Sequence, residues 1–211
     1  MTATENTRNV LVGVDVQNDF ITGSLAVNEG DQVVEPLNKI AAEVRETGGD
    51  VAFTRDWHPP TTPHFDIWPV HCVAGTDGAD FHPELVIAPT DTMISKGMEQ
   101  TDGYSGMQGV SDNGTTLETL VEPTSPEEKV RVFIGGLATD YCVKATALDL
   151  AERFGNDERV QLFLIRDAIR AVGLGPDDES VALRAMQEAK IIAMGSDEIR
   201  EQFFAREGFA L

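Results

Sequence analysis

Regular alternation of short apolar strands with amphipathic helices is the feature that most constrains this 211-residue chain. The hydrophobic patterns predict strands at 10–14, 51–54, 92–95, 130–134, 160–165 and 191–194, and helices at 31–46, 115–121, 140–154 and 177–189. Such alternation favours a parallel sheet, because right-handed crossovers return every strand in the same direction and place helices on both faces. We therefore predict a three-layer, Rossmann-like α/β fold with a parallel sheet of about six strands.

One domain is expected to contain the whole chain, since the sequence has no internal repeat, low-complexity segment or linker-like shift in composition. We predict a single domain over 1–211, with a flexible N-terminal tail at 1–9 and a helical C-terminal extension at 196–211. The extension has apolar residues that can dock on the domain or on another subunit, so a homo-oligomer is one expected arrangement.

The formal net charge of −20 disfavours binding to nucleic acids and to anionic membranes. Two cysteines are typical of a reducing compartment, and the N-terminus lacks the basic start and apolar run of a signal peptide. The chain also has no apolar stretch of the roughly 18 residues that span a bilayer. We therefore expect a cytoplasmic protein that acts on a small neutral or cationic molecule.

Cys142 lies just after a predicted strand, at the expected first turn of a helix where Thr139 or Asp140 could be the N-cap. Unpaired amides and the helix dipole at such a position favour a thiolate. A lone cysteine in a helical segment is, however, more often a small packing residue. The choice between nucleophile and core residue therefore depends on its neighbours in space.

Asp15 and Lys96 each follow directly on a predicted strand. The carboxyl ends of parallel strands share one edge of the sheet, where ligands bind in folds of this class. A carboxylate beside a thiol is a general base, and a cation there stabilises a thiolate. If the strands before Asp15 and Cys142 are neighbours, the three residues form a nucleophile, base and cation set. Otherwise Asp15 is a turn residue and Lys96 a solvated one.

A long segment, 57–89, contains every histidine of the chain. Asp56 and His58 would point the same way on an extended chain, and His64 and His71 follow within the same loop. Mixed carboxylate and imidazole ligands suit a divalent ion such as zinc, iron or manganese. The pattern favours a metal site, although the spacing alone does not require one.

Five motifs occur in order along the chain: Asp15–Phe20, Arg55–Pro59, Trp68–Cys72, Ser95–Gly97 and Gly136–Val143. With them the chain, from about Val10 to Ser196, resembles the nicotinamidase/pyrazinamidase branch of the isochorismatase-like hydrolases. The histidine-rich loop separates this branch from metal-free relatives. The resemblance implies hydrolysis of nicotinamide to nicotinate and ammonia through a cysteine thioester, with pyrazinamide as a further substrate, in NAD salvage.

The resemblance also implies the roles of individual residues. The catalytic triad is Asp15, Lys96 and Cys142. One divalent metal ion is bound by Asp56, His58 and His71, and His64 is a ligand in some members only. Zinc is the expected ion, with iron or manganese as alternatives. A cis peptide is expected at Leu137–Ala138, an oxyanion hole at the amides of Ala138 and Cys142, and a substrate pocket at Phe20, Trp68, Tyr104 and Leu137. Met107 stands where relatives often have an aromatic residue, which leaves the shape of the pocket open.

Three other classes of function remain open. One is a metal-independent amidase of the same superfamily that acts on a carbamoyl or ureido compound, and another is a non-catalytic metal-binding protein on the same fold. The third is a metallohydrolase in which metal-bound water is the nucleophile. The sequence also leaves open the identity of the metal, the preferred carboxamide and the oligomeric state.

Overall fold

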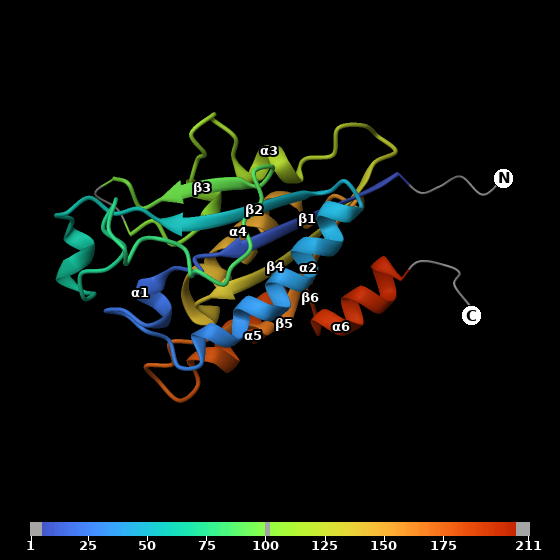
Figure 1. Cartoon of the computed structure of the whole chain (residues 1–211). Coiled ribbons are helices and arrows are strands. Elements are labelled where there is room, and N and C mark those ends of the chain that lie inside the picture. The colour runs from blue at the N-terminus through green and yellow to red at the C-terminus, as the bar shows by residue number, and fades with distance from the viewer. Residues whose placement is uncertain (1–5, 100–101, 206–211) are drawn as a thin grey trace.

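A six-stranded parallel sheet forms the centre of the computed structural model, which describes residues 6–99 and 102–205 (Figure 1). The strand order is β3-β2-β1-β4-β5-β6. The strands are β1 (Thr7–Val14), β2 (Asp50–Asp56), β3 (Thr92–Lys96), β4 (Lys129–Leu137), β5 (Val160–Arg170) and β6 (Ile192–Met194). The order reverses between β1 and β4, and such a switch point opens a crevice at the carboxyl ends of the strands.

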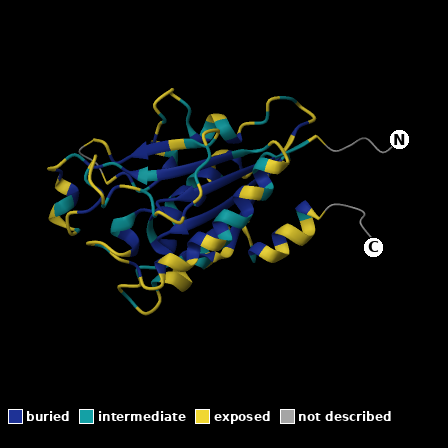
Figure 2. Cartoon of the chain, in the orientation of Figure 1, coloured by how far each residue is buried: buried dark blue, intermediate teal, exposed yellow. Residues whose placement is uncertain are grey.

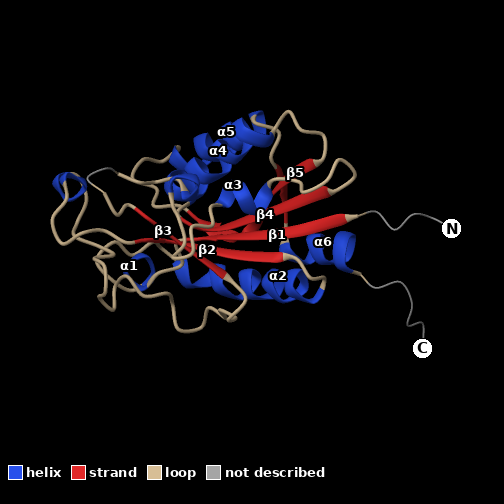
Figure 3. Ribbon diagram, turned by 90° about the horizontal axis from the view of Figure 1, so that it is seen from above, coloured by secondary structure: helices blue, strands red, loops and turns tan. Residues whose placement is uncertain are grey.

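Helices cover both faces of this sheet, which confirms the predicted three-layer fold (Figure 3). The helices are α1 (Asn18–Ile21), α2 (Val34–Glu46), α3 (Leu117–Val121), α4 (Lys144–Phe154), α5 (Asp178–Glu188) and α6 (Ser196–Ile199). Helices α2 and α6 lie on one face, whereas α3, α4 and α5 lie on the other. Short π-helices precede α4, at Thr139–Val143, and follow α6, at Arg200–Phe204.

The central strands β1 and β4 are largely buried on both sides, because successive side chains point to opposite faces of the sheet and helices cover both faces (Figure 2). In β1, Leu11 belongs to the core beneath α2, whereas Val10, Val12 and Val14 belong to the core beneath α4. This double burial explains why the strand is a continuous apolar run without polar alternation. Among the described residues, the structure contains no helix with the length and apolar character needed to cross a bilayer.

The first strand begins earlier than predicted, so part of the expected N-terminal tail at 1–9 is strand. Thr7 pairs with Lys129 on β4, and the Arg8 guanidinium forms ion pairs with Asp50 and Glu128 at 2.9 and 3.0 Å. These partners are distant in sequence, so local pattern did not indicate the extra residues. Residues 1–5 of the predicted tail lie outside the described residues.

The predicted C-terminal extension is helical from Ser196 to Phe204 and docks on its own sheet. Phe203 and Phe204 pack on Phe133 of β4, with ring centroids 5.9 and 5.7 Å apart. Of the two docking arrangements considered, this segment therefore follows the intramolecular one. The remainder of the predicted extension, 206–211, lies outside the described residues.

Gly136 allows β4 to approach β1 at the switch point. Its φ is +123°, and a Cβ atom added there would lie 2.0 Å from the carbonyl oxygen of Val14.

We expect Gly136→Ala to lower the free energy of unfolding by more than about 3 kcal/mol, because the effects of backbone strain and of a steric clash add together. Gly114→Ala is the matched control, since Gly114 has a φ of +85° but open space around it, and should cost about 1 kcal/mol. Equal losses in urea unfolding would contradict the steric argument.

Candidate active site

Four polar side chains meet at the carboxyl edge of the sheet. Asp15 follows β1, Asp56 and Lys96 are the last residues of β2 and β3, and Cys142 lies in the π-helix after β4. Asp56 and Lys96 are paired in the sheet register, and β1 and β4 are neighbours, as the proposed triad required. All four side chains are buried.

The Lys96 ammonium joins the other three groups into one network. Its Nζ lies 2.8 Å from Asp15 Oδ2, 2.6 Å from Asp56 Oδ1 and 3.5 Å from Cys142 Sγ. Burial by itself lowers the pKa of Lys96, but the two carboxylates outweigh this effect and hold the pKa well above its ordinary value. Lys96 is therefore a fixed positive charge at the centre of the site.

The two carboxylates around Lys96 differ in acidity. Burial raises the pKa of Asp15, and the attraction of Lys96 only partly opposes that effect. Burial acts on Asp56 in the same direction, but the attraction of Lys96 outweighs it and holds the pKa of Asp56 below the usual range. Asp56 is therefore a permanent anion, whereas Asp15 is a stronger base than an ordinary aspartate.

The Cys142 thiol is neutral in this environment, so the expectation that a helix start favours the thiolate was wrong. Burial raises the pKa of the thiol well above its usual value, and the Asp15 and Asp56 carboxylates raise it further against the pull of Lys96. One Asp15 carboxylate oxygen lies within 4.8 Å of the Cys142 sulfur. A neutral thiol beside a strengthened base can lose its proton to that base as the sulfur attacks an electrophile.

Neither predicted N-cap residue caps the segment that contains Cys142. The π-helix follows Ala138 without a side-chain cap. The Asp140 carboxylate instead accepts hydrogen bonds from the amides of Val172 and Gly173, both at 2.9 Å. Asp140 thereby ties the loop after β5 to the segment that contains Cys142.

Two buried side chains support the carboxylates, and both escaped the sequence analysis. Thr54 donates a hydrogen bond to Asp15 Oδ1 at 2.6 Å. The Gln17 amide spans the backbone of Asp56, donating to its carbonyl and accepting from its N–H, both at 2.8 Å. Only knowledge that β1 and β2 are neighbours could have indicated these contacts.

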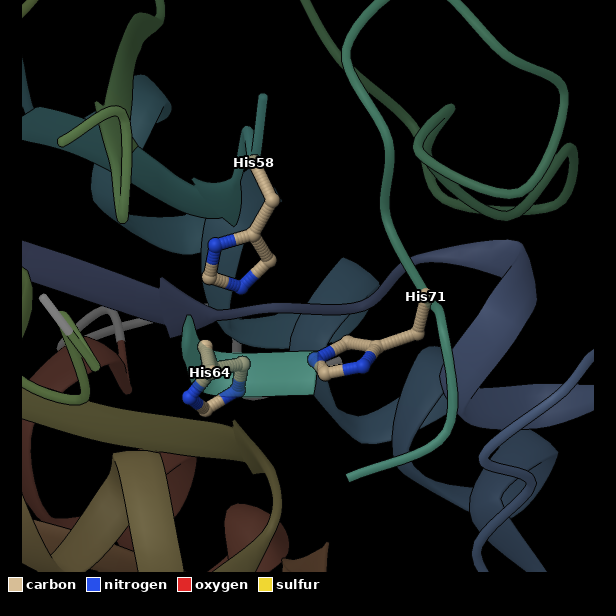
Figure 4. Close-up of side chains that lie close together, drawn as sticks. All are labelled: His58, His64 and His71. Carbon is tan, nitrogen blue, oxygen red and sulfur yellow. The ribbon is translucent and has the colours of Figure 1, made fainter. Parts of the chain in front are cut away.

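Three histidines form a cluster next to this network (Figure 4). The rings of His58, His64 and His71 have centroids 4.7 to 5.2 Å apart. Each Nδ1 contacts an oxygen that can only accept, so each carries its proton there and leaves Nε2 as the free lone pair. The three oxygen partners are Gly97 O at 2.9 Å, Asp102 Oδ1 at 2.8 Å and Pro69 O at 2.7 Å.

These residues fit a divalent metal ion. One nitrogen atom from each of the three rings lies within 4.8 Å of the others, and the buried Nε2 of His58 has no hydrogen-bond partner. A buried lone pair without a partner costs free energy, which a bound cation would offset. Asp56 Oδ2 lies 3.8 Å from His58 Nε2, at the border between cluster and network. His64, left open by the resemblance, belongs to the cluster.

A small cavity lies between the Cys142 thiol and the histidine cluster. Cys142, His64 and His71 line it, together with Asp56 and Ala138. Phe20, Trp68 and Tyr104 line it as well, as expected for pocket residues. Leu25, Tyr141 and Val172 also line the cavity and were missed. Leu25 and Val172 come from segments without a recognisable motif, whereas Tyr141 lies in the Gly136–Val143 motif but had been given no role.

Leu137 does not line the cavity, contrary to its predicted role. Its side chain is fully buried in the core beneath α2, because it continues the alternation of β4. The cis peptide implied by the resemblance is present between Leu137 and Ala138. Met107 packs in the opposite core, beside α4. Met107 is not among the residues that line the cavity, so the lack of an aromatic residue at this position does not change the lining.

Fold and site together define a cysteine hydrolase: a neutral thiol, a strengthened carboxylate base and a buried lysine lie at the switch point of a parallel α/β sheet. Residues 9–198 match the Isochorismatase domain, and the chain belongs to this family. The predicted resemblance is confirmed.

Known relatives are similar over most of their length. The chain is 38% identical over 189 residues to the nicotinamidase/pyrazinamidase of Mycobacterium tuberculosis, covering 86% of this chain and 95% of the relative. Among solved structures, the pyrazinamidase of Pyrococcus horikoshii in complex with zinc matches with a TM-score of 0.75 and 34% identity, covering 89% of this chain and 99% of the other. PnC1 from L. infantum in complex with nicotinate matches with a TM-score of 0.74 and 30% identity, covering 91% and 94%.

Asp15→Asn should lower the pKa of the Cys142 thiol, because a negative charge that opposes thiolate formation is removed while Lys96 remains. The measurement is a titration of thiolate ultraviolet absorbance against pH. Cys142→Ala provides the blank for tyrosines and for Cys72. A midpoint that stays in place or moves to higher pH would show that Asp15 does not control the thiol.

Proposed function

We propose that this chain is a nicotinamidase, which hydrolyses nicotinamide to nicotinate and ammonia and also accepts pyrazinamide. The observation that carries the proposal is that the Cys142 thiol and the histidine cluster line the same small cavity. One bound molecule can therefore present a carboxamide to the sulfur and a ring nitrogen to a metal. The names of the relatives, which act on or bind pyridine compounds, support the same substrate class.

The first half of the reaction forms a thioester. Asp15 accepts the thiol proton as Cys142 Sγ attacks the carboxamide carbon, and the carbonyl oxygen becomes an oxyanion. In this proposal the N–H groups of Ala138 and Cys142 stabilise the oxyanion. The C–N bond then breaks, and the proton on Asp15 moves to the leaving nitrogen, so that ammonia departs and an acyl group remains on sulfur.

The second half releases the acid. The Asp15 carboxylate removes a proton from water while the water oxygen attacks the thioester carbon. The C–S bond breaks, the proton on Asp15 returns to Cys142 sulfur, and the acid loses its remaining proton to solvent and leaves as nicotinate. Lys96 keeps its charge throughout and stabilises the negative sulfur at both stages, because its pKa is held high.

The metal ion serves recognition in this proposal. His58, His64, His71 and Asp56 would hold it, and it would supply a Lewis acid for the pyridine nitrogen. Zinc suits three imidazoles and one carboxylate, and the Pyrococcus pyrazinamidase was solved in complex with zinc. Phe20, Trp68 and Tyr104 add aromatic surface against which the substrate ring can pack.

Other expectations from the sequence stay predictions. The histidine cluster weighs against a metal-independent amidase for carbamoyl or ureido compounds, and the complete triad weighs against a non-catalytic metal-binding protein. A cytoplasmic location, a homo-oligomer and the lack of nucleic-acid or membrane partners rest on the sequence alone.

Cys142→Ala should reduce the kcat for ammonia release from nicotinamide by at least about 10³-fold, because no other group replaces the nucleophile. Cys72→Ala is the control. The Cys72 thiol is also buried, but its sulfur contacts the Gly78 carbonyl outside the cavity, so this variant should retain activity. Ordinary turnover by Cys142→Ala would exclude the thioester mechanism.

Removal of the metal should raise the KM for nicotinamide by at least about tenfold, which corresponds to about 1.4 kcal/mol of lost coordination. Benzamide, which lacks the ring nitrogen, should show no such change, and addition of zinc should restore nicotinamide binding. Alkylation of Cys142 should inactivate the metal-loaded enzyme. A metallohydrolase would instead survive alkylation and lose its activity on both amides when the metal is removed.

A further inference from the structure

The oxygen partners of the three histidines differ in kind. His58 and His71 donate from Nδ1 to main-chain carbonyls, those of Gly97 and Pro69. His64 donates to a side chain, the carboxylate of Asp102. His64 is buried, whereas the Asp102 side chain is 50% exposed, so the carboxylate closes the outer side of the cluster.

Backbone packing places Asp102 beside His64. Gly103 has a φ of +62°, and a Cβ atom there would lie 2.6 Å from Gly97 Cα. A Cβ on Gly97 would in turn lie 2.5 Å from the His58 ring. The two glycines therefore bring the segment that contains Asp102 onto the histidine cluster, where bulkier residues would hold it away.

Tyr104, the residue after Gly103, is anchored as well. Trp68 Nε1 donates a hydrogen bond to Tyr104 Oη at 3.0 Å, and both side chains line the cavity. The two residues that follow Asp102 are therefore both fixed, Gly103 by a backbone contact and Tyr104 by a hydrogen bond. These contacts hold the backbone of Asp102 in place from its C-terminal side.

We propose that Asp102 is a positioning residue for the metal site, a role that rests on the metal-dependent function proposed above. By accepting the Nδ1 proton of His64, Asp102 holds the ring in the tautomer that offers Nε2 to the ion. Its negative charge also makes His64 a more basic ligand. A carboxylate that is half exposed acts more weakly than a buried one, because solvent screens its charge.

The test is the dissociation constant for zinc, measured by competition with a chromogenic chelator on the full-length protein. Asp102→Ala should weaken zinc binding about tenfold, near the lower end of the range for outer partners of metal ligands. Asp102→Asn should weaken it less, since the amide oxygen can still accept the Nδ1 proton. With cobalt in place of zinc, the visible spectrum of Asp102→Ala should change, because the orientation of one ligand is released.

Two further variants complete the design. Glu99→Gln removes one negative charge from an exposed side chain close to Asp102 in sequence, and should change zinc affinity by less than about twofold. His64→Ala removes the ligand itself, and its loss of zinc affinity is the maximum against which the other variants are compared. Loss of affinity in Asp102→Ala with recovery in Asp102→Asn and no loss in Glu99→Gln would support the proposal.

The outcomes separate this inference from the proposed function. Wild-type affinity in Asp102→Ala, with a clear loss in His64→Ala, would overturn the role of Asp102 and leave the metal site intact. Equal losses in Asp102→Ala and Glu99→Gln would also overturn it, because general charge would then explain the effect. If His64→Ala bound zinc like the wild type, His64 would not be a ligand, and the role of Asp102 would fail while a site of Asp56, His58 and His71 remained. If the wild type bound no zinc, the metal site itself would fail as well.

Discussion

The buried ammonium of Lys96 is the constraint on which the site depends. A charged group out of contact with water is tolerated only when opposite charges and hydrogen bonds compensate the lost hydration. Lys96 has two carboxylates within 2.8 Å, and these come from the ends of β1 and β2. Strand order, register and strand length must all be right for Asp15 and Asp56 to meet one nitrogen. The same order brings the segment after β4 beside β1 and places the Cys142 sulfur 3.5 Å from Nζ.

One lysine serves two carboxylates that do different work, and the difference arises from their surroundings. Asp56 stays charged because of Lys96, and its other oxygen, beside His58, can bind a cation at the histidine cluster. Asp15 faces Lys96 and a neutral thiol in complete burial, so its affinity for a proton is raised. Paired acids with diverging pKa values mark the division between a proton-transfer group and a fixed charge. Asp15 therefore serves proton transfer and Asp56 serves the metal site, although both carboxylates contact the same lysine nitrogen.

The histidine cluster depends on a different kind of contact, the hydrogen bonds that orient each ring from outside the cluster. Each histidine is oriented by an oxygen on the side away from the presumed ion position, and two of these oxygens belong to the main chain. Main-chain partners require exact loop paths, which explains the close approach of Gly97 to the His58 ring. Asp102 achieves the same orientation for His64 with a side chain. The path of each loop is therefore tied to the histidine ring that its oxygen atom orients.

The sequence by itself determined the α/β alternation, the strand-end positions of Asp15 and Lys96 and the grouping of the histidines, because each depends on local periodicity or on short motifs. Tertiary structure alone decided the neutral state of the Cys142 thiol and the cavity contributions of Leu25 and Val172. These depend on charges and surfaces that distant strands bring together, and a local pattern contains no information about such distances. Sequence reasoning placed a thiolate at a helix start, whereas burial, together with two carboxylates from other strands, raises the pKa of the thiol and reverses that balance.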